Sequence, residues 1–181
     1  LSLTSPMPEF TSRVCPALCE AACNLGSVDG QPATIHDNER AISDHEWANG
    51  GPRRFEPAGE GAPTVAMVGS GPAGLVAAWE LARRGARVTV FERDDRPGGL
   101  LMYGIPNMKL DKRIIARRVD FMRAEGVVFR TGCHVGVDLP AEALHPTPVF
   151  KVIRFDTQSR HSLSPRYPAT PRKSAGNTPN L

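Results

Sequence analysis

The chain has 181 residues, of which 40% are hydrophobic and 23% charged, a composition typical of a globular protein with one main domain. It has no apolar run of the roughly 18 residues that span a membrane, and Leu1–Phe10 lacks the basic start and apolar core of a secretory signal. The positive net charge of +3 comes from residues 146–181, which contain six Lys and Arg residues but only one Asp. The rest of the chain has no excess of basic residues, so we expect neither a nucleic-acid nor a membrane partner.

Residues 1–50 are predicted to form a helical arm, from Glu9 through the Ile35–Trp47 stretch, which carries a group of three cysteines. Cys15, Cys19 and Cys23 lie within nine residues, whereas Cys133 is an isolated loop or strand residue. An odd local group without a secretory signal favours a metal or cluster site in a reducing, cytoplasmic compartment over a disulfide framework. If one helix runs through the group, Cys19 and Cys23 share a face and Cys15 reaches in from the helix start. The alternative is three small residues that bind no cluster.

Two segments lack the periodicity of helices and strands. Residues 51–63 are rich in Gly and Pro, which predicts a linker. Residues 146–181 contain six prolines and many Ser, Thr and Arg, with one short apolar patch at Val149–Phe155. We therefore predict a mostly disordered tail.

Residues 64–145 alternate strand-like and helix-like runs, which predicts an α/β fold with a Rossmann-like βαβ unit. Thr64–Val68 is a short apolar strand, and the helix after it is expected to reach about Arg84. Arg87–Phe91 is the second expected strand and Val127–Arg130 the third.

A glycine-rich corner joins the first strand to its helix. Its sequence is Gly69-Ser70-Gly71-Pro72-Ala73-Gly74, and Glu92 follows 18 residues later at the end of the second strand. In this context Gly69 allows the tight turn, Gly71 leaves room for a pyrophosphate, and Gly74 lets the helix approach the strand. The helix N-terminus attracts the phosphates, and Glu92 can accept hydrogen bonds from ribose hydroxyls while repelling a 2′-phosphate. The alternative is a glycine-rich turn in an unrelated α/β protein.

A second glycine turn, Pro97-Gly98-Gly99-Leu100, follows the acidic residue. NAD binding does not require it, and it suggests a loop over a larger, flat cofactor; a plain surface turn is the alternative. Asp111 is expected to begin a helix with an apolar stripe at Ile115, Val119 and Met122. The polar face of this helix is expected to carry Lys112, Arg113, Arg117 and Arg118. In the earlier helix, Trp79 lies off the stripe of small residues, so we expect it to be partly exposed.

The segment from Val65 to Gly126 closely resembles the small (beta) subunit family of glutamate synthase. The resemblance is most specific over Arg96–Lys112, which reads RPGGLLMYGIPNMKLDK. Independently, Pro8–Thr11, the three cysteines and Asn38-Glu39 resemble the N-terminal iron–sulfur domain of that family. Another flavin and iron–sulfur NAD(P)H oxidoreductase, such as dihydropyrimidine dehydrogenase, is the alternative relative.

This resemblance implies an oxidoreductase that takes electrons from NADPH or NADH through FAD and [4Fe–4S] clusters to a large (alpha) subunit or domain, where glutamate is made. It implies that FAD is bound by the first glycine corner, by Glu92 and Arg93, and by Gly98, Gly99 and Leu100. It also implies cluster ligation by Cys15, Cys19 and Cys23, with Glu39 as an unusual non-cysteine ligand.

The sequence departs from the family pattern at both ends. The family's upstream cysteine group is missing, and after Leu144 the second glycine-rich unit, which binds NAD(P)H, does not appear. We therefore interpret the chain as a fragment, inactive alone, or as a non-catalytic remnant. Without a return segment, the apolar faces around Val65–Val68 and Val88–Val90 are expected to remain partly exposed and to leave FAD binding weak.

Overall fold

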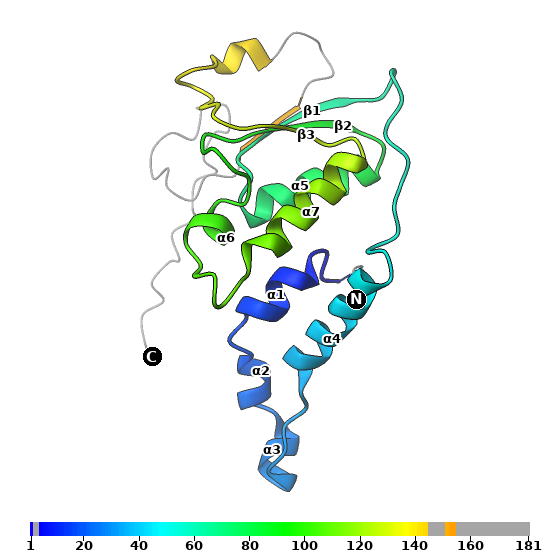
Figure 1. Ribbon diagram of the computed structural model, residues 1–181, viewed down its shortest axis with the longest axis vertical. Coiled ribbons are helices and arrows are strands. Elements are labelled where there is room, and N and C mark those ends of the chain that lie inside the picture. The colour runs from blue at the N-terminus through cyan, green and yellow to red at the C-terminus, as the bar shows by residue number, and fades with distance from the viewer. Residues whose placement is uncertain (2–3, 145–150, 155–181) are drawn as a thin grey trace, which may run out of the picture.

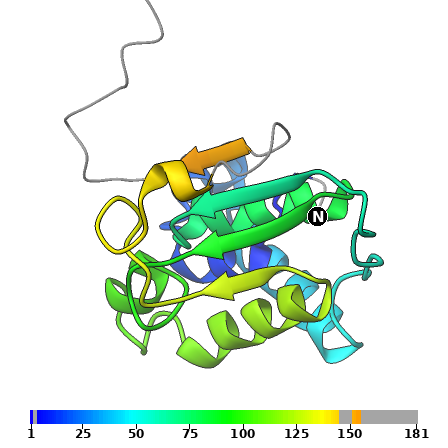
Figure 2. The same ribbon diagram turned by 90° about the horizontal axis from the view of Figure 1, so that it is seen from above.

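A four-stranded parallel sheet forms the centre of the computed structural model, which describes residues 1, 4–144 and 151–154, the last four by their backbone. The strand order is β3-β2-β1-β4, as seen from above in Figure 2. The strands are β1 (Thr64–Val68), β2 (Arg87–Phe91), β3 (Val128–Arg130) and β4 (Lys151–Arg154). β1 and β2 pair from Thr64 opposite Arg87 to Val68 opposite Phe91, which confirms the predicted parallel βαβ unit.

Two long helices cover one face of this sheet, α5 (Pro72–Arg83) and α7 (Lys112–Ala124) (Figure 1). Helix α5 connects β1 to β2, and α7 lies in the connection from β2 to β3, because neighbouring parallel strands need a crossover connection. The predicted apolar stripe of α7 is confirmed, because Ile115, Val119 and Met122 are all buried. Asp111 accepts a hydrogen bond from the Arg113 N–H at 2.9 Å, so the predicted start of the helix is also confirmed. The short helices α6 (Leu100–Tyr103) and η1 (Ala141–Leu144) lie in the connecting loops.

The N-terminal residues form four helices below α7 in Figure 1. They are α1 (Pro8–Val14), α2 (Leu18–Ala21), α3 (Asn24–Asp29) and α4 (Ile35–Ala48). α1 and α4 pack on each other beside α7, whereas α2 and α3 extend away from the sheet. The helical character predicted for residues 1–50 is therefore present. The helices alone do not test whether this segment binds an iron–sulfur cluster, so that part stays a prediction.

The three cysteines do not share one helix, so Cys19 and Cys23 do not lie on a common helix face. Cys15 is the residue after α1, with extended backbone, and Ala17 has a φ of 52°. Cys19 lies in the single turn α2, and Cys23 precedes α3, again with extended backbone. Pro16 has no N–H to continue α1, and its ring disfavours helical geometry at Cys15, so the chain breaks there.

The sheet is also more fully covered than the sequence indicates. Val65, Met67, Val88 and Val90 are all buried, so the expected exposure of these strands is wrong. Helices α5 and α7 cover one face, and a small cluster of Ala66, Phe91 and Leu144 forms on the other.

The last described strand lies within the predicted tail. β4 pairs in parallel with β1, from Val65 opposite Lys151 to Val68 opposite Arg154. Lys151–Arg154 belongs to the short apolar patch of the mostly disordered tail that the sequence predicts, and it extends the ladder on the free side of β1. Residues 145–150 and 155–181 lie outside the described residues.

Residues 51–63 contain no helix or strand, as a linker should, yet they pack against the domain. The rings of Phe55 and Trp79 lie 6.4 Å apart, and Trp79 is buried rather than partly exposed. Its indole N–H donates to Glu125 Oε2 at 2.8 Å, which satisfies the polar end of the ring. Within residues 4–144 and 151–154, no helix has the length and apolar character that crossing a bilayer requires.

Candidate nucleotide-binding site

The glycine corner lies where β1 ends and α5 begins. Gly69 has a φ of 95°, which an L side chain rarely adopts, and its N–H donates to the Phe91 carbonyl at 2.8 Å. The corner is therefore tied to the neighbouring strand β2. Gly71 is the N-cap of α5, and Pro72 occupies the first helical position, where the missing N–H has no cost. The free N–H groups of the first turn of α5 thus begin at this corner.

Gly71 and Gly74 have different surroundings. A Cβ on Gly74 would lie 2.2 Å from the Gly69 carbonyl oxygen, so only glycine permits this approach of helix to strand. A Cβ on Gly71 would have no atom within 4 Å. The close-approach role predicted for Gly74 and the open space predicted beside Gly71 are both present in the geometry.

The Glu92 carboxylate points at the corner and is almost fully buried, with 5% of the residue exposed. Its Oε2 accepts hydrogen bonds from the Ser70 N–H at 2.9 Å and from the Ser70 hydroxyl. Its Oε1 accepts the Asp94 N–H at 3.1 Å. Sequence reasoning placed Glu92 beside this corner but did not predict that Ser70 would hold it in place.

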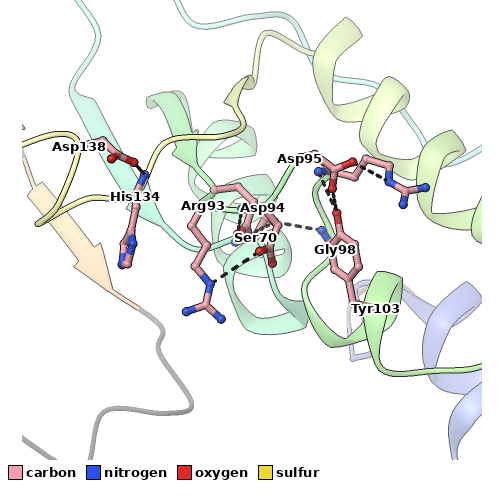
Figure 3. Close-up of polar contacts among 10 residues, drawn as sticks. Ser70, Arg93, Asp94, Asp95, Gly98, Tyr103, His134 and Asp138 are labelled. Carbon is pink, nitrogen blue, oxygen red and sulfur yellow. Dashed lines mark hydrogen bonds and ion pairs between the residues drawn. The ribbon is translucent and has the colours of Figure 1, made fainter.

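The Ser70 hydroxyl also connects the corner to the second glycine turn. It accepts a hydrogen bond from the Gly98 N–H at 3.0 Å (Figure 3). Gly99 then contacts the first corner directly, since a Cβ on Gly99, whose φ is 51°, would lie 2.9 Å from the Gly71 Cα. The two glycine turns, 28 residues apart, therefore form one structural unit.

Polar contacts hold the segment between these turns. The Tyr103 hydroxyl donates to Asp95 Oδ1 and accepts the Arg96 N–H, the latter at 3.1 Å (Figure 3). Partial burial and the Asp95 carboxylate raise the pKa of Tyr103, and the Tyr103 hydroxyl lowers the pKa of Asp95. Asp95 is therefore a carboxylate and Tyr103 a neutral phenol at neutral pH.

These elements surround a cavity of about 290 Å³ at the carboxyl ends of the parallel strands, where α/β folds bind their ligands. The lining includes all predicted cofactor-binding residues except Gly98: Gly69, Ser70, Gly71, Pro72, Ala73, Gly74, Glu92, Arg93, Gly99 and Leu100. Gly98 contributes indirectly through Ser70.

Sequence reasoning missed the far wall of this cavity. Cys133, His134 and Val135 line it, together with Asp94 and Tyr103. The first three follow β3, and the Cys133 N–H donates to the Glu92 carbonyl at 2.9 Å. The order of the strands could have predicted this contribution. Because β3 is parallel to β2, the residues after β3 lie at the same edge of the sheet as those after β2.

Comparisons with known proteins agree with this geometry. A family model described as "NAD(P)-binding Rossmann-like domain" matches residues 67–113, which span the corner, Glu92 and the second glycine turn. The glutamate synthase [NADPH] small chain of Mycobacterium tuberculosis is 52% identical over 144 residues, and that of Bacillus subtilis is 48% identical over 141 residues. Over about four fifths of its length, the chain is similar to part of these glutamate synthase small chains. The glutamate synthase [NADH] of Schizosaccharomyces pombe is also similar, with 50% identity over 147 residues.

The match to these glutamate synthases covers only part of each relative. It includes 80% of this chain but 29% of the Mycobacterium small chain and 7% of the Schizosaccharomyces protein. A solved amine oxidase from Pseudomonas geniculata resembles 61% of this chain and 16% of its own, with 24% identity and a TM-score of 0.43.

The cysteines expected to bind clusters in glutamate synthase small chains do not converge here. Cys15 and Cys19 are exposed and Cys23 is half-buried, and all three are free thiols. Among the described residues, no three His, Cys, Asp or Glu side chains lie close enough to hold a metal ion. The role of Cys15, Cys19, Cys23 and Glu39 as cluster ligands therefore stays a prediction.

Backbone N–H groups nevertheless donate hydrogen bonds to two of the sulfur atoms. The Ala17 N–H donates to Cys15 Sγ at 3.4 Å, and the Ala33 N–H donates to Cys23 Sγ at 3.5 Å. The hydrogen bond from Ala33, with others from Leu25 and Gly26, lowers the pKa of the Cys23 thiol. These hydrogen bonds stabilise the anionic form of Cys23, which is the form of cysteine that metals bind.

Proposed function

We propose that residues 64–144 bind FAD and form the flavin-binding part of an NAD(P)H-dependent oxidoreductase of the glutamate synthase type. One observation carries this proposal: the glycine corner, the start of α5 and the buried Glu92 carboxylate meet at one cavity. About 50% identity to glutamate synthases over four fifths of the chain supports the reaction class.

The residues of the cavity fit the adenosine diphosphate half of FAD. A diphosphate fits the open space beside Gly71, where the first turn of α5 offers N–H groups and a partial positive charge. Glu92 Oε1 accepts one backbone N–H and has capacity for a ribose hydroxyl. The volume of about 290 Å³ is at the lower end of the roughly 300–1,000 Å³ of ligand pockets, which suits half of a dinucleotide.

The buried carboxylate argues for FAD rather than NADP(H) at this corner. Glu92 would repel a 2′-phosphate on the ribose it binds, whereas FAD has no such phosphate. We assign Gly69, Ser70, Gly71, Pro72, Ala73, Gly74, Glu92 and Arg93 to the adenosine diphosphate, and Gly98, Gly99 and Leu100 to the turn beside it.

FAD supplies the chemistry of accepting a hydride from NAD(P)H and passing electrons on singly. The relatives' names specify NADPH for the small chains and NADH for the Schizosaccharomyces protein, so we propose NAD(P)H as donor without distinguishing the two. We further propose a glutamate synthase large subunit or domain as the electron-accepting partner, in the cytoplasm.

A [4Fe–4S] cluster on the N-terminal helices belongs to the same proposal. The N–H···S contacts at Cys15 and Cys23 suit sulfur ligands, since such hydrogen bonds tune iron–sulfur sites. Because the described residues bring no three ligands together, Cys15, Cys19, Cys23 and Glu39 would need ligands from outside them.

Titration of the purified chain with FAD and, separately, with NADPH tests the proposal. We expect FAD to bind with quenching of its fluorescence and to be displaced by ADP, and NADPH to bind much more weakly. Binding of NADPH with no binding of FAD would overturn the assignment in favour of a nicotinamide site. Binding of neither would show that the cavity does not accept a dinucleotide.

A further inference from the structure

The loop between Gly99 and Lys112 forms one side of the cavity. Leu100 and Tyr103 line the cavity, and Gly99 contacts Gly71. Helix α6 in this loop has four residues, far fewer than the roughly 12 that an isolated helix needs in water. The loop therefore depends on contacts from outside itself to keep its place on the glycine corner.

The Lys112 side chain provides such contacts. Its Nζ donates to the Leu101 carbonyl at 2.7 Å and also to the Ile105 carbonyl. Both carbonyls lie in or just after α6, where a cation compensates carbonyl groups that the short helix leaves unpaired. The Lys112 backbone N–H also donates to Asn107 Oδ1, at 3.1 Å.

Helix α7 supports the turn from a second position. Ile115, one turn after Lys112, is fully buried, and its Cγ2 would lie 3.2 Å from a Cβ placed on Gly98. The first turn of α7 thus touches both ends of the Gly98–Ile105 segment. Packing against Ile115 limits how far the turn can move, and the ammonium fixes its carbonyl end.

We propose that Lys112 is a positioning residue for nucleotide binding, which fastens the Gly98–Ile105 segment against the glycine corner through the Leu101 and Ile105 carbonyls. The inference rests on the proposed function in so far as the ligand is FAD. Lys112 lies outside the cavity lining and acts through Gly99 and Leu100.

The test compares Lys112→Met, which keeps the length of the side chain but removes its donors, with Lys112→Arg, which restores a cation with several donors. Lys109→Met is the matched control, because it makes the same substitution at an exposed lysine of the same loop, whose side chain has no hydrogen bond or ion pair with the described residues. Amide hydrogen exchange of residues 98–105 is measured without ligand, and the Kd is measured for FAD and for ADP.

We expect Lys112→Met to raise exchange in residues 98–105 and to weaken FAD and ADP binding about tenfold, which corresponds to loss of about 1.4 kcal/mol. Lys112→Arg should restore most of the protection from exchange and most of the affinity, and Lys109→Met should change neither quantity. Unchanged exchange in Lys112→Met overturns the inference, whether or not the wild-type chain binds FAD. Raised exchange with an unchanged Kd overturns the role in binding, whereas a wild-type chain that binds no FAD refutes the proposed function separately.

Discussion

Arg118 and Glu9 form an ion pair in the protein interior, although 109 residues separate them in the sequence. Arg118 Nε donates to Glu9 Oε1, and neither side chain has any exposed surface. The Arg118 guanidinium also lies 4.9 Å from the ring centre of Trp47 and 5.4 Å from that of Trp79. The pair therefore joins α1 to α7, which fastens the N-terminal helices to the nucleotide-binding unit.

Replacing one partner of this pair should destabilise the protein strongly. Glu9→Ala leaves the Arg118 charge buried without a counter-ion, which typically costs about 3–5 kcal/mol. The double replacement Glu9→Leu with Arg118→Met removes both charges and should cost much less. Urea unfolding measures the free energy of unfolding of the wild type, of Glu9→Ala and of the double variant.

Arg40→Ala is the control for this experiment. Arg40 pairs with Asp44 at 3.6 Å on the surface, and such pairs contribute about 0–1 kcal/mol. If Glu9→Ala is no more destabilising than Arg40→Ala, the buried pair does not have the role we give it.

This ion pair also marks a limit of the sequence analysis. The stripe of Ile115, Val119 and Met122 predicted the face of α7 that meets the sheet, because helical periodicity is a local property. Arg118 was expected in solvent, but α1 packs on a second face of α7 and the Trp47 ring of α4 meets Phe121 there. No local pattern predicts a charged residue whose partner lies 109 positions away.

Part of the candidate site could be predicted from the sequence and part could not. The glycine corner and Glu92 could be predicted because the corner depends on neighbouring residues, namely a positive φ at Gly69 and a close approach of helix to strand at Gly74. The link from Ser70 to Gly98 depends on where a side chain points, and the contribution of Cys133 depends on the pairing of β2 with β3. These relationships exist only in the folded chain.

Alanine at Gly71 and at Gly74 should have different effects. Gly74→Ala places a Cβ 2.2 Å from the Gly69 carbonyl, so α5 must move away from the sheet and both stability and FAD binding should fall. Gly71→Ala meets no protein atom, and its φ of −61° suits alanine, so stability should remain near that of the wild type. FAD binding should still be lost, because the new methyl group occupies the space of the diphosphate.

Thermal unfolding and FAD titration of both variants check this contrast. The assignment of the diphosphate to this corner fails if Gly71→Ala binds FAD as tightly as the wild type. Gly85→Ala, outside the cavity at the end of α5, is a control for the effect of an added methyl group on stability; its φ of 86° should make it moderately destabilising without a direct effect on the cavity.

The start of α7 should lose stability in acid. The Arg113 side chain and then its backbone N–H lower the pKa of Asp111 to about 2 from 3.8. Because the folded-state pKa is the lower one, ionised Asp111 contributes stability above about pH 4, and this contribution disappears as the pH falls to about 2. Asp111→Asn can still cap the helix but cannot ionise, so it should be less stable than the wild type above pH 4.

The difference in Tm between wild type and Asp111→Asn, measured from pH 6 to pH 2, checks this prediction. It should be constant above about pH 5 and shrink toward pH 2. In an Arg113→Met background the same difference should be smaller throughout, because the guanidinium that lowers the pKa is absent. A Tm difference that grows as the pH falls would contradict the assigned direction.

Cys23 should react as a thiolate at lower pH than an ordinary cysteine does. The Ala33 N–H, which lies 3.5 Å from Sγ, lowers the thiol pKa most, because it stabilises the negative sulfur. In a chain with Cys15, Cys19 and Cys133 replaced by serine, iodoacetamide should alkylate Cys23 with an apparent pKa below that of a cysteine in an unstructured peptide. Ala33→Pro removes the N–H and should move this pKa upward, whereas Ala33→Gly keeps the N–H and should not. If both replacements leave the alkylation profile unchanged, the Ala33 N–H does not stabilise the thiolate.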